Sequence, residues 1–135
     1  MEMKKILLDT NAFSAFRGGD KAILSALASA DVVYLSIFVI GELLAGFAGG
    51  KRNRENRAQL DEFKSKSTVK VLAATEETAN IFASIKNTLK QAGRPIPIND
   101  IWIAAHALET GAAVVTLDKH FNAIDGLRIV DLGGK

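Results

Sequence analysis

Apolar residues along the chain fall into short continuous runs, separated by longer segments of helical periodicity. The short runs predict buried strands at residues 4–8, 32–35, 69–72, 113–116 and 128–130. Segments in which apolar residues recur every three or four positions predict helices. These are expected at residues 11–16, after the cap residue Asp20, from Ser36 to Gly49-Gly50, across the basic segment that follows, from Thr75 to Gly93, and from Asn99 or Asp100 to about Thr110.

Strands alternate with helices throughout, and few connections suit a tight hairpin. This pattern is typical of α/β folds and predicts a mainly parallel sheet with helices on both faces. Right-handed crossovers then place the carboxyl ends of the strands along one edge, where open sheets form their ligand crevice. The 135 residues contain no internal repeat or linker, so we expect a single domain over residues 1–135.

The composition excludes several classes of protein. The chain has no cysteine, which rules out disulfides and thiolate metal sites. Apolar residues make up 48% and charged residues 24%, as in globular proteins. No apolar run approaches membrane-spanning length, and the apolar residues before Asp9 are too few for a signal-peptide core. We therefore expect a soluble, cytoplasmic protein without membrane contact.

The net charge of +2 indicates little about partners, but basic residues gather between Lys51 and Lys70. Such a segment could contact phosphate groups. The residues alone favour a second interpretation, in which the segment is the solvated face of a helix.

Three aspartates are expected at the edge of the sheet where the strands end. Asp9 follows the first strand, Asp118 lies two residues beyond the strand ending at Thr116, and Asp100 stands in the first turn of a helix. Glu42 differs, because it lies within a helix and has apolar neighbours on both sides. A buried charge needs a partner or a metal ion.

Each acid taken alone also has an ordinary explanation. Asp9 can cap the following helix, Asp100 suits a first turn, and Asp118 suits a turn. Glu42 could extend to solvent or pair with an arginine.

Together the four acids predict a metal site. Four carboxylates in one crevice repel one another unless cations intervene. Oxygen ligands select hard cations, which indicates Mg²⁺ or Mn²⁺, and such a crevice suits phosphodiester hydrolysis.

At these four positions the chain resembles the PIN-domain nucleases, and within them the VapC-type ribonuclease toxins of prokaryotic toxin–antitoxin pairs. The matching blocks are residues 6–11 (ILLDTN), 40–43 (IGEL), 99–105 (NDIWIAA) and 115–121 (VTLDKHF). They occur in the family's order and span most of the chain.

The resemblance implies a three-layer, Rossmann-like α/β/α fold and Mg²⁺- or Mn²⁺-dependent endonuclease activity on RNA. It also implies a homodimer inhibited by an antitoxin protein. By the motif match, Asp9, Glu42, Asp100 and Asp118 bind metal and activate water. Thr116 would orient the acidic site, and Asn11 could hold a carboxylate or the substrate.

One position departs from the family pattern. Many PIN domains carry a further acid just after the fourth position, whereas Lys119, His120 and Asn122 follow Asp118 here. The number of metal ions therefore stays open. Candidate contacts to the RNA backbone, which would position RNA without reading its sequence, are Arg17, Lys51, Arg52, Arg54 and His120.

Two aromatic side chains on the helix of Asp100 are expected to pack rather than to react. His106 lies about 120° around the helix from Asp100, so we expect a packed or solvent-facing histidine. Trp102 also points away from Asp100 and is expected in the core or a dimer interface.

Three other functions compete with the nuclease. A haloacid dehalogenase-type phosphatase needs a second aspartate where Asn11 stands, and a phosphoacceptor receiver domain needs paired acids that are not apparent. A catalytically silent PIN-like module that binds RNA or protein is the remaining alternative, and the presence of all four carboxylates argues against it.

Overall fold

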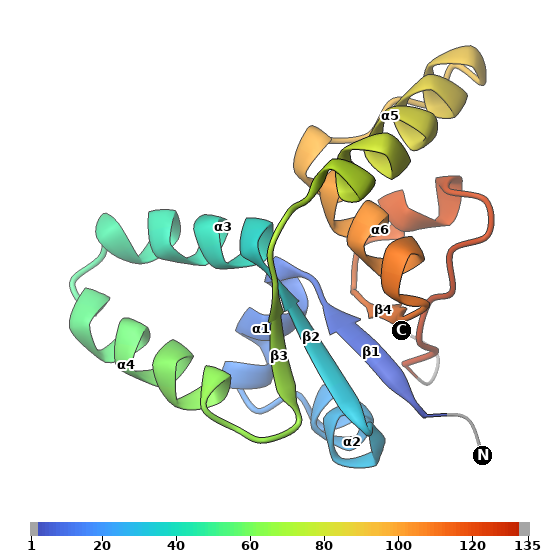
Figure 1. Ribbon diagram of the computed structural model, residues 1–135. Helices are drawn as coiled ribbons and strands as arrows, with labels where there is room; N and C mark the ends of the chain where they lie inside the picture. The colour runs from blue at the N-terminus through green and yellow to red at the C-terminus, as the bar shows by residue number, and fades with distance from the viewer. Residues whose placement is uncertain (1–2, 133–135) are drawn as a thin grey trace.

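Residues 3–132 are described by the computed structural model (Figure 1). Within them, four strands form one sheet in the order β3-β2-β1-β4, and every neighbouring pair is parallel. The strands are β1 (Lys5–Leu8), β2 (Val32–Ser36), β3 (Val69–Leu72) and β4 (Ala113–Val115).

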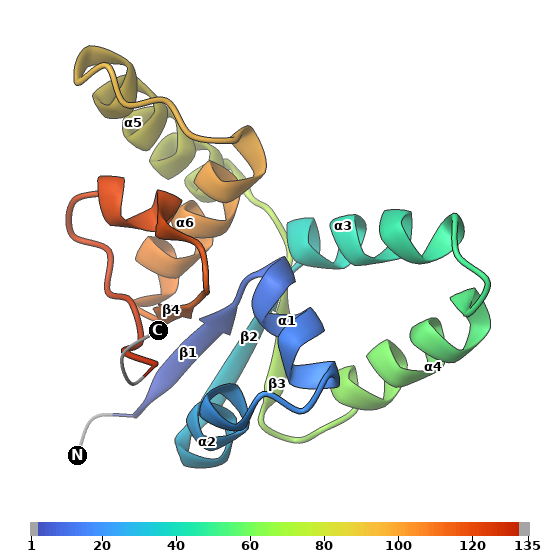
Figure 2. The same ribbon diagram turned by 180° about the vertical axis from the view of Figure 1, so that it is seen from behind.

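Six α-helices and one 3₁₀ helix connect these strands in residues 3–132. They are α1 (Thr10–Arg17), α2 (Lys21–Ser29), α3 (Ile37–Ala48), α4 (Asn53–Lys64), α5 (Glu76–Gln91), α6 (Ile98–Thr110) and η1 (Lys119–Ala123). Figures 1 and 2 show α1 and α2 against one face of the sheet and α6 against the other. The predicted three-layer α/β/α fold with a parallel sheet is therefore confirmed. No helix among these residues combines the length and apolar character that crossing a membrane requires.

The central strand β1 is apolar because both of its faces are covered. Ile6, Leu7 and Leu8 are each 1% exposed or less. Ile6 pairs with Val33 of β2 on one side and with Ala113 of β4 on the other. The chain therefore adds β2 and β3 on one side of β1 and later adds β4 on its other side. A crevice is expected at the carboxyl end of β1, where the connections diverge.

The predicted caps begin their helices. The Asp20 carboxylate accepts backbone N–H bonds from the first turn of α2, and the Ser36 hydroxyl accepts the Phe38 N–H at 3.1 Å. Thr75 and Thr78 form a reciprocal capping box at the start of α5.

Several boundaries differ from the sequence prediction by one residue, as in β1, which begins at Lys5, and β4, which ends at Val115. Residues 128–130 form no strand but a single bridge, in which Ile129 lies beside Val114, because both backbone bonds to this segment come from Val114. Helix α6 begins at Ile98, one residue early, because the Pro97 carbonyl already accepts the N–H of Asp100 at 3.1 Å.

Candidate metal centre

Asp9 joins the end of β1 to the start of α1. Its backbone N–H continues the pairing with β4 by donating to the Val115 carbonyl at 3.2 Å. Its carboxylate is buried: Oδ1 accepts the Ala12 N–H at 2.8 Å as the N-cap of α1, and Oδ2 accepts the hydroxyl of Thr116. The helix-cap interpretation of Asp9 is therefore confirmed, and the cap leaves Oδ2 directed to Thr116 at the end of β4.

Thr116 links two of the acids through one hydroxyl group. Its Oγ1 donates to Asp9 and accepts the backbone N–H of Asp118 at 2.9 Å. Asp118 in turn caps η1, because its Oδ1 accepts the His120 N–H at 2.9 Å. In Asp118, as in Asp9, Oδ1 caps a helix and Oδ2 faces the other side chains of the site.

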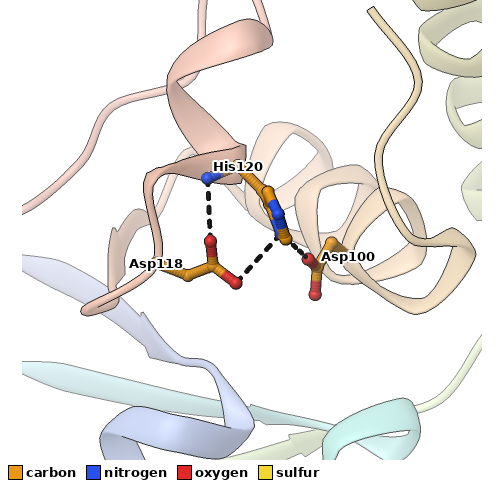
Figure 3. A group of neighbouring side chains, drawn as sticks. All are labelled: Asp100, Asp118 and His120. Carbon is orange, nitrogen blue, oxygen red and sulfur yellow. Dashed lines mark hydrogen bonds and ion pairs between the residues drawn. The ribbon is translucent and has the colours of Figure 1, made fainter.

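Asp100 and Asp118 meet across the imidazole of His120 (Figure 3). The His120 Nδ1 lies 3.1 Å from Asp100 Oδ2 and 3.0 Å from Asp118 Oδ2. One ligand atom from each of the three side chains lies within 4.8 Å of the others. Ionised carboxylate oxygens can only accept, so Nδ1 carries a hydrogen when it bonds to them.

Glu42 reaches the same edge from α3. Its half-buried carboxylate accepts the hydroxyl of Thr10 at 2.6 Å, so its partner is a threonine in the first turn of α1 and not an arginine. Thr10 directly follows Asp9 and therefore places Glu42 next to the end of β1.

The charges in this group affect one another. Burial raises the pKa of Asp9 above its ordinary value of 3.8, and the charges of Asp100 and Asp118 raise it further. Hydrogen bonds from Thr116 and Ala12 oppose this rise.

Asp100 behaves in the same way. Burial raises its pKa, the charges of Asp118 and Glu42 add to the rise, and His120 opposes it. We call Asp9, Glu42, Asp100 and Asp118 the acidic cluster. Its oxygen ligands, with one imidazole beside them, suit a divalent cation that would relieve this repulsion.

A family model of the PIN domain matches residues 6–127. The chain belongs to the PIN-domain family. One relative is Ribonuclease VapC1 of Haemophilus influenzae strain R2866, which is 34% identical over 130 residues, 93% of this chain and 96% of the relative.

Two solved structures share this PIN fold. The VapBC-1 structure from nontypeable Haemophilus influenzae matches with a TM-score of 0.83 and 28% identity over 95% of this chain and 98% of that one. VapBC-5 from Mycobacterium tuberculosis, described as a member of the VapBC family of toxin–antitoxin systems, matches with a TM-score of 0.67 and 25% identity. That match covers 93% of this chain and 98% of the other. The predicted resemblance to VapC-type PIN ribonucleases is confirmed.

The other residues predicted for the site lie on α1, or on α4 and the turn before it. Asn11 is exposed beside Thr10 in the first turn of α1. Arg17, at the end of α1, donates to Gln59 at 2.8 Å and to Asn56, and its guanidinium lies over the Phe47 ring, 5.3 Å from the centroid. It therefore connects α1 to α3 and α4.

The basic segment predicted from sequence forms α4 and the turn before it. Lys51, Arg52 and Arg54 are exposed. Arg52 pairs with the exposed Glu55 at 2.7 Å, a contact that contributes little to stability.

The two aromatic residues on α6 pack as predicted. Trp102 stacks between Phe38 and Phe82, with ring centroids 4.9 and 3.8 Å away. His106 is 1% exposed, with Nε2 3.1 Å from the Ala73 carbonyl and Nδ1 2.9 Å from the Ser36 hydroxyl. A carbonyl can only accept, so Nε2 carries the hydrogen and the neutral ring accepts from Ser36 at Nδ1.

Sequence reasoning missed two contacts of the acidic cluster. The motif match gives no role to Thr10, although its position directly after Asp9 is a local signal. The sequence predicts an RNA contact for His120, whereas its ring lies between Asp100 and Asp118. Only the packing of η1 against α6, 20 residues apart in sequence, reveals that contact.

Proposed function

We propose that this PIN protein is an endoribonuclease that depends on Mg²⁺ or Mn²⁺ and acts as the toxin of a type II toxin–antitoxin pair. The main support is the acidic cluster: four carboxylates from separate segments gather at the carboxyl ends of β1 and β4. Burial first, and then the charges of neighbouring acids, raise the pKa values of Asp9 and Asp100, and a divalent cation would offset both effects. The ribonuclease named above supports RNA as the substrate.

In this proposal Asp9, Asp100 and Asp118 hold the ion, and Glu42 completes the site. The chemistry that Mg²⁺ or Mn²⁺ supplies when bound is charge neutralisation at the phosphodiester and a lower pKa of water. Thr116 keeps Asp9 and Asp118 in place by its two hydrogen bonds. We assign the acceptance of a proton from the attacking water to Glu42, which Thr10 orients by its hydrogen bond at 2.6 Å. Asn11, which is exposed and follows Thr10 in the sequence, would hold a carboxylate or contact the substrate.

The substrate would approach along a cleft of about 220 Å³ beside Asp118. Lys119 and Asn122 line this cleft and could bind an RNA phosphate. Arg17, Lys51, Arg52 and Arg54 would bind the backbone farther along the strand.

Further parts of the proposal concern assembly. The solved VapBC complexes support an antitoxin protein as partner. We also propose a homodimer, a cytoplasmic location and a single PIN domain over residues 1–135, which the match over residues 6–127 supports.

The central test is cleavage of single-stranded RNA by the purified chain with Mg²⁺ or Mn²⁺. We expect cleavage that a chelator abolishes. Asp100→Asn should reduce the rate at least about a hundredfold with unchanged folding, because Asn preserves shape but removes the charge. Asp125→Asn, an exposed acid outside the cluster, is the matched control and should cleave like the wild type.

Two outcomes would reject the nuclease. Cleavage that persists in Asp100→Asn would mean that the acidic cluster is not the active site. RNA binding without cleavage in either metal would favour the silent module.

The toxin role has a separate test in cells. Expression of the wild type should arrest growth, and the Asp100→Asn variant should not. Co-expression with the small protein encoded next to it should restore growth. Normal growth despite active enzyme would reject the toxin role and leave the ribonuclease intact.

A further inference from the structure

His120 occupies the place where one more ligand of the acidic cluster would be expected. Its Nδ1 lies 3.1 Å from Asp100 Oδ2 and 3.0 Å from Asp118 Oδ2 (Figure 3). The His120 backbone N–H donates to Asp118 Oδ1 at 2.9 Å, so the backbone that carries the ring is held against one of the two acids.

We propose that His120 binds the metal ion through Nδ1, together with Asp100 and Asp118, and that it directs this centre toward Mn²⁺ over Mg²⁺. The inference rests on the proposed function only in requiring that these acids bind a divalent cation.

The two distances from Nδ1 fit neighbouring ligands of one metal ion. With metal–ligand bonds of about 2.1 Å, neighbouring ligands of an octahedral ion lie about 3.0 Å apart. The two distances from Nδ1 have this length. The ligand atoms of the three side chains lie within 4.8 Å of one another, so they can surround one ion. The Nδ1 hydrogen must leave before the ion binds there: a neutral ring changes tautomer and carries its hydrogen on Nε2, and a doubly protonated ring releases one proton to solvent.

The nitrogen ligand determines the preference between ions. Mg²⁺ strongly favours oxygen ligands and keeps its water in preference to imidazole. Mn²⁺ also accepts carboxylates, but as a transition metal it binds imidazole more readily. A site with two carboxylates and one imidazole therefore favours Mn²⁺ more than a site built only from carboxylates.

A competing explanation makes His120 a counter-ion that neutralises Asp100 and Asp118 and leaves when metal binds. Its side chain is 49% exposed, which leaves it room to move away. The two explanations predict opposite effects of removing the ring: loss of a ligand weakens metal binding, whereas loss of a competing cation strengthens it.

The test measures metal binding by the full-length protein without RNA. Pulsed electron paramagnetic resonance of bound Mn²⁺ detects a directly coordinated imidazole nitrogen, and calorimetry gives the Mn²⁺ and Mg²⁺ affinities. The chain has only two histidines. Both ring nitrogens of the other, His106, are hydrogen-bonded inside the protein, so the signal can be assigned to His120.

We expect nitrogen coupling in the wild type and in the control Asp125→Asn, which changes an exposed acid just beyond the same 3₁₀ helix. In His120→Ala the coupling should vanish. The Mn²⁺ affinity should fall at least about tenfold and the Mg²⁺ affinity less than about threefold.

The outcomes separate the two proposals. Mn²⁺ binding without nitrogen coupling, or equal or tighter Mn²⁺ binding by His120→Ala, would overturn the ligand role of His120 and leave the proposed function standing. An equal fall in both affinities would overturn the Mn²⁺ preference. Absence of Mn²⁺ and Mg²⁺ binding by the wild type would overturn the proposed function itself.

Discussion

The two histidines of this chain stand at the same edge of the sheet in opposite surroundings. His106 lies at the carboxyl ends of β2 and β3, where Ser36 and the Ala73 carbonyl hold it in a closed, neutral pocket. His120 lies at the carboxyl ends of β1 and β4, half exposed between two carboxylates. Helix α6 serves both places, because it carries His106 on one face and Asp100 on another.

Burial distinguishes a structural histidine from one that is accessible to a ligand. In the closed pocket each ring nitrogen has a neutral partner, and burial lowers the pKa of His106. In the acidic cluster four carboxylates lie close together, and burial and the neighbouring acids raise the pKa values of Asp9 and Asp100. Only the second region retains charge that a ligand could neutralise.

The largest expected difference between the two regions is in stability. His106→Ala should lower the free energy of unfolding by about 3 kcal/mol, because it opens a cavity and removes the acceptor of the Ser36 O–H and the donor to the Ala73 carbonyl. His120→Ala should change it by less than about 0.5 kcal/mol. Urea unfolding of both variants in the presence of chelator measures the difference. Equal losses would remove the distinction between the two histidines.

The next prediction concerns hydroxyl groups that position a functional side chain. Thr10 holds Glu42 as Ser36 holds His106. Thr10→Val keeps the shape but removes the hydrogen bond, so RNA cleavage should slow about tenfold while the melting temperature changes little. Thr10→Ser, which restores a hydroxyl, should recover most of the rate. Equal loss in the valine and serine variants would show that the methyl group matters and the hydrogen bond does not.

The smallest effect expected is on the pH dependence of stability without metal. The pKa of His106 is lowered in the folded state, so its contribution to stability is present above pH 6.5 and is lost as the pH falls below that value. Asp9 and Asp100 act in the opposite direction. Their folded pKa values are raised, so their charging reduces stability as the pH rises above 3.8.

Unfolding measured from pH 4 to 8 in chelator tests both signs. His106→Gln should flatten the decline below pH 6.5 by about 1 kcal/mol or less, and Asp9→Asn should reduce the loss at higher pH. An unchanged pH profile in both variants would contradict these assignments.

The sequence predicted the gathering of the acids because that gathering depends on strand ends. Asp9 directly follows β1, and Asp118 follows Thr116 at the end of β4. Parallel strands bring such positions to one edge, so their neighbourhood follows from the fold class alone. The helix caps were predictable for a similar reason, since a cap involves residues only two or three positions apart.

Contacts between distant helices were not predictable from local pattern. The bond from Thr10 to Glu42 joins residues 32 positions apart, and the contact of His120 with Asp100 joins residues 20 positions apart. Both depend on how helices pack over the sheet. Periodicity identifies the apolar face of a helix but not the neighbour of each polar side chain.

The helix caps at the acidic edge also affect how a cation can be bound. Oδ1 of Asp9 caps α1 and Oδ1 of Asp118 caps η1, so a cation that takes both oxygens of either carboxylate competes with a backbone N–H for one of them. Ca²⁺ is a larger ion that commonly takes both oxygens of a carboxylate and gathers up to eight ligands. Such chelation by Asp9 or Asp118 would weaken the amide bond that caps the helix. Two backbone amide groups therefore favour a smaller ion that takes one oxygen from each of these aspartates.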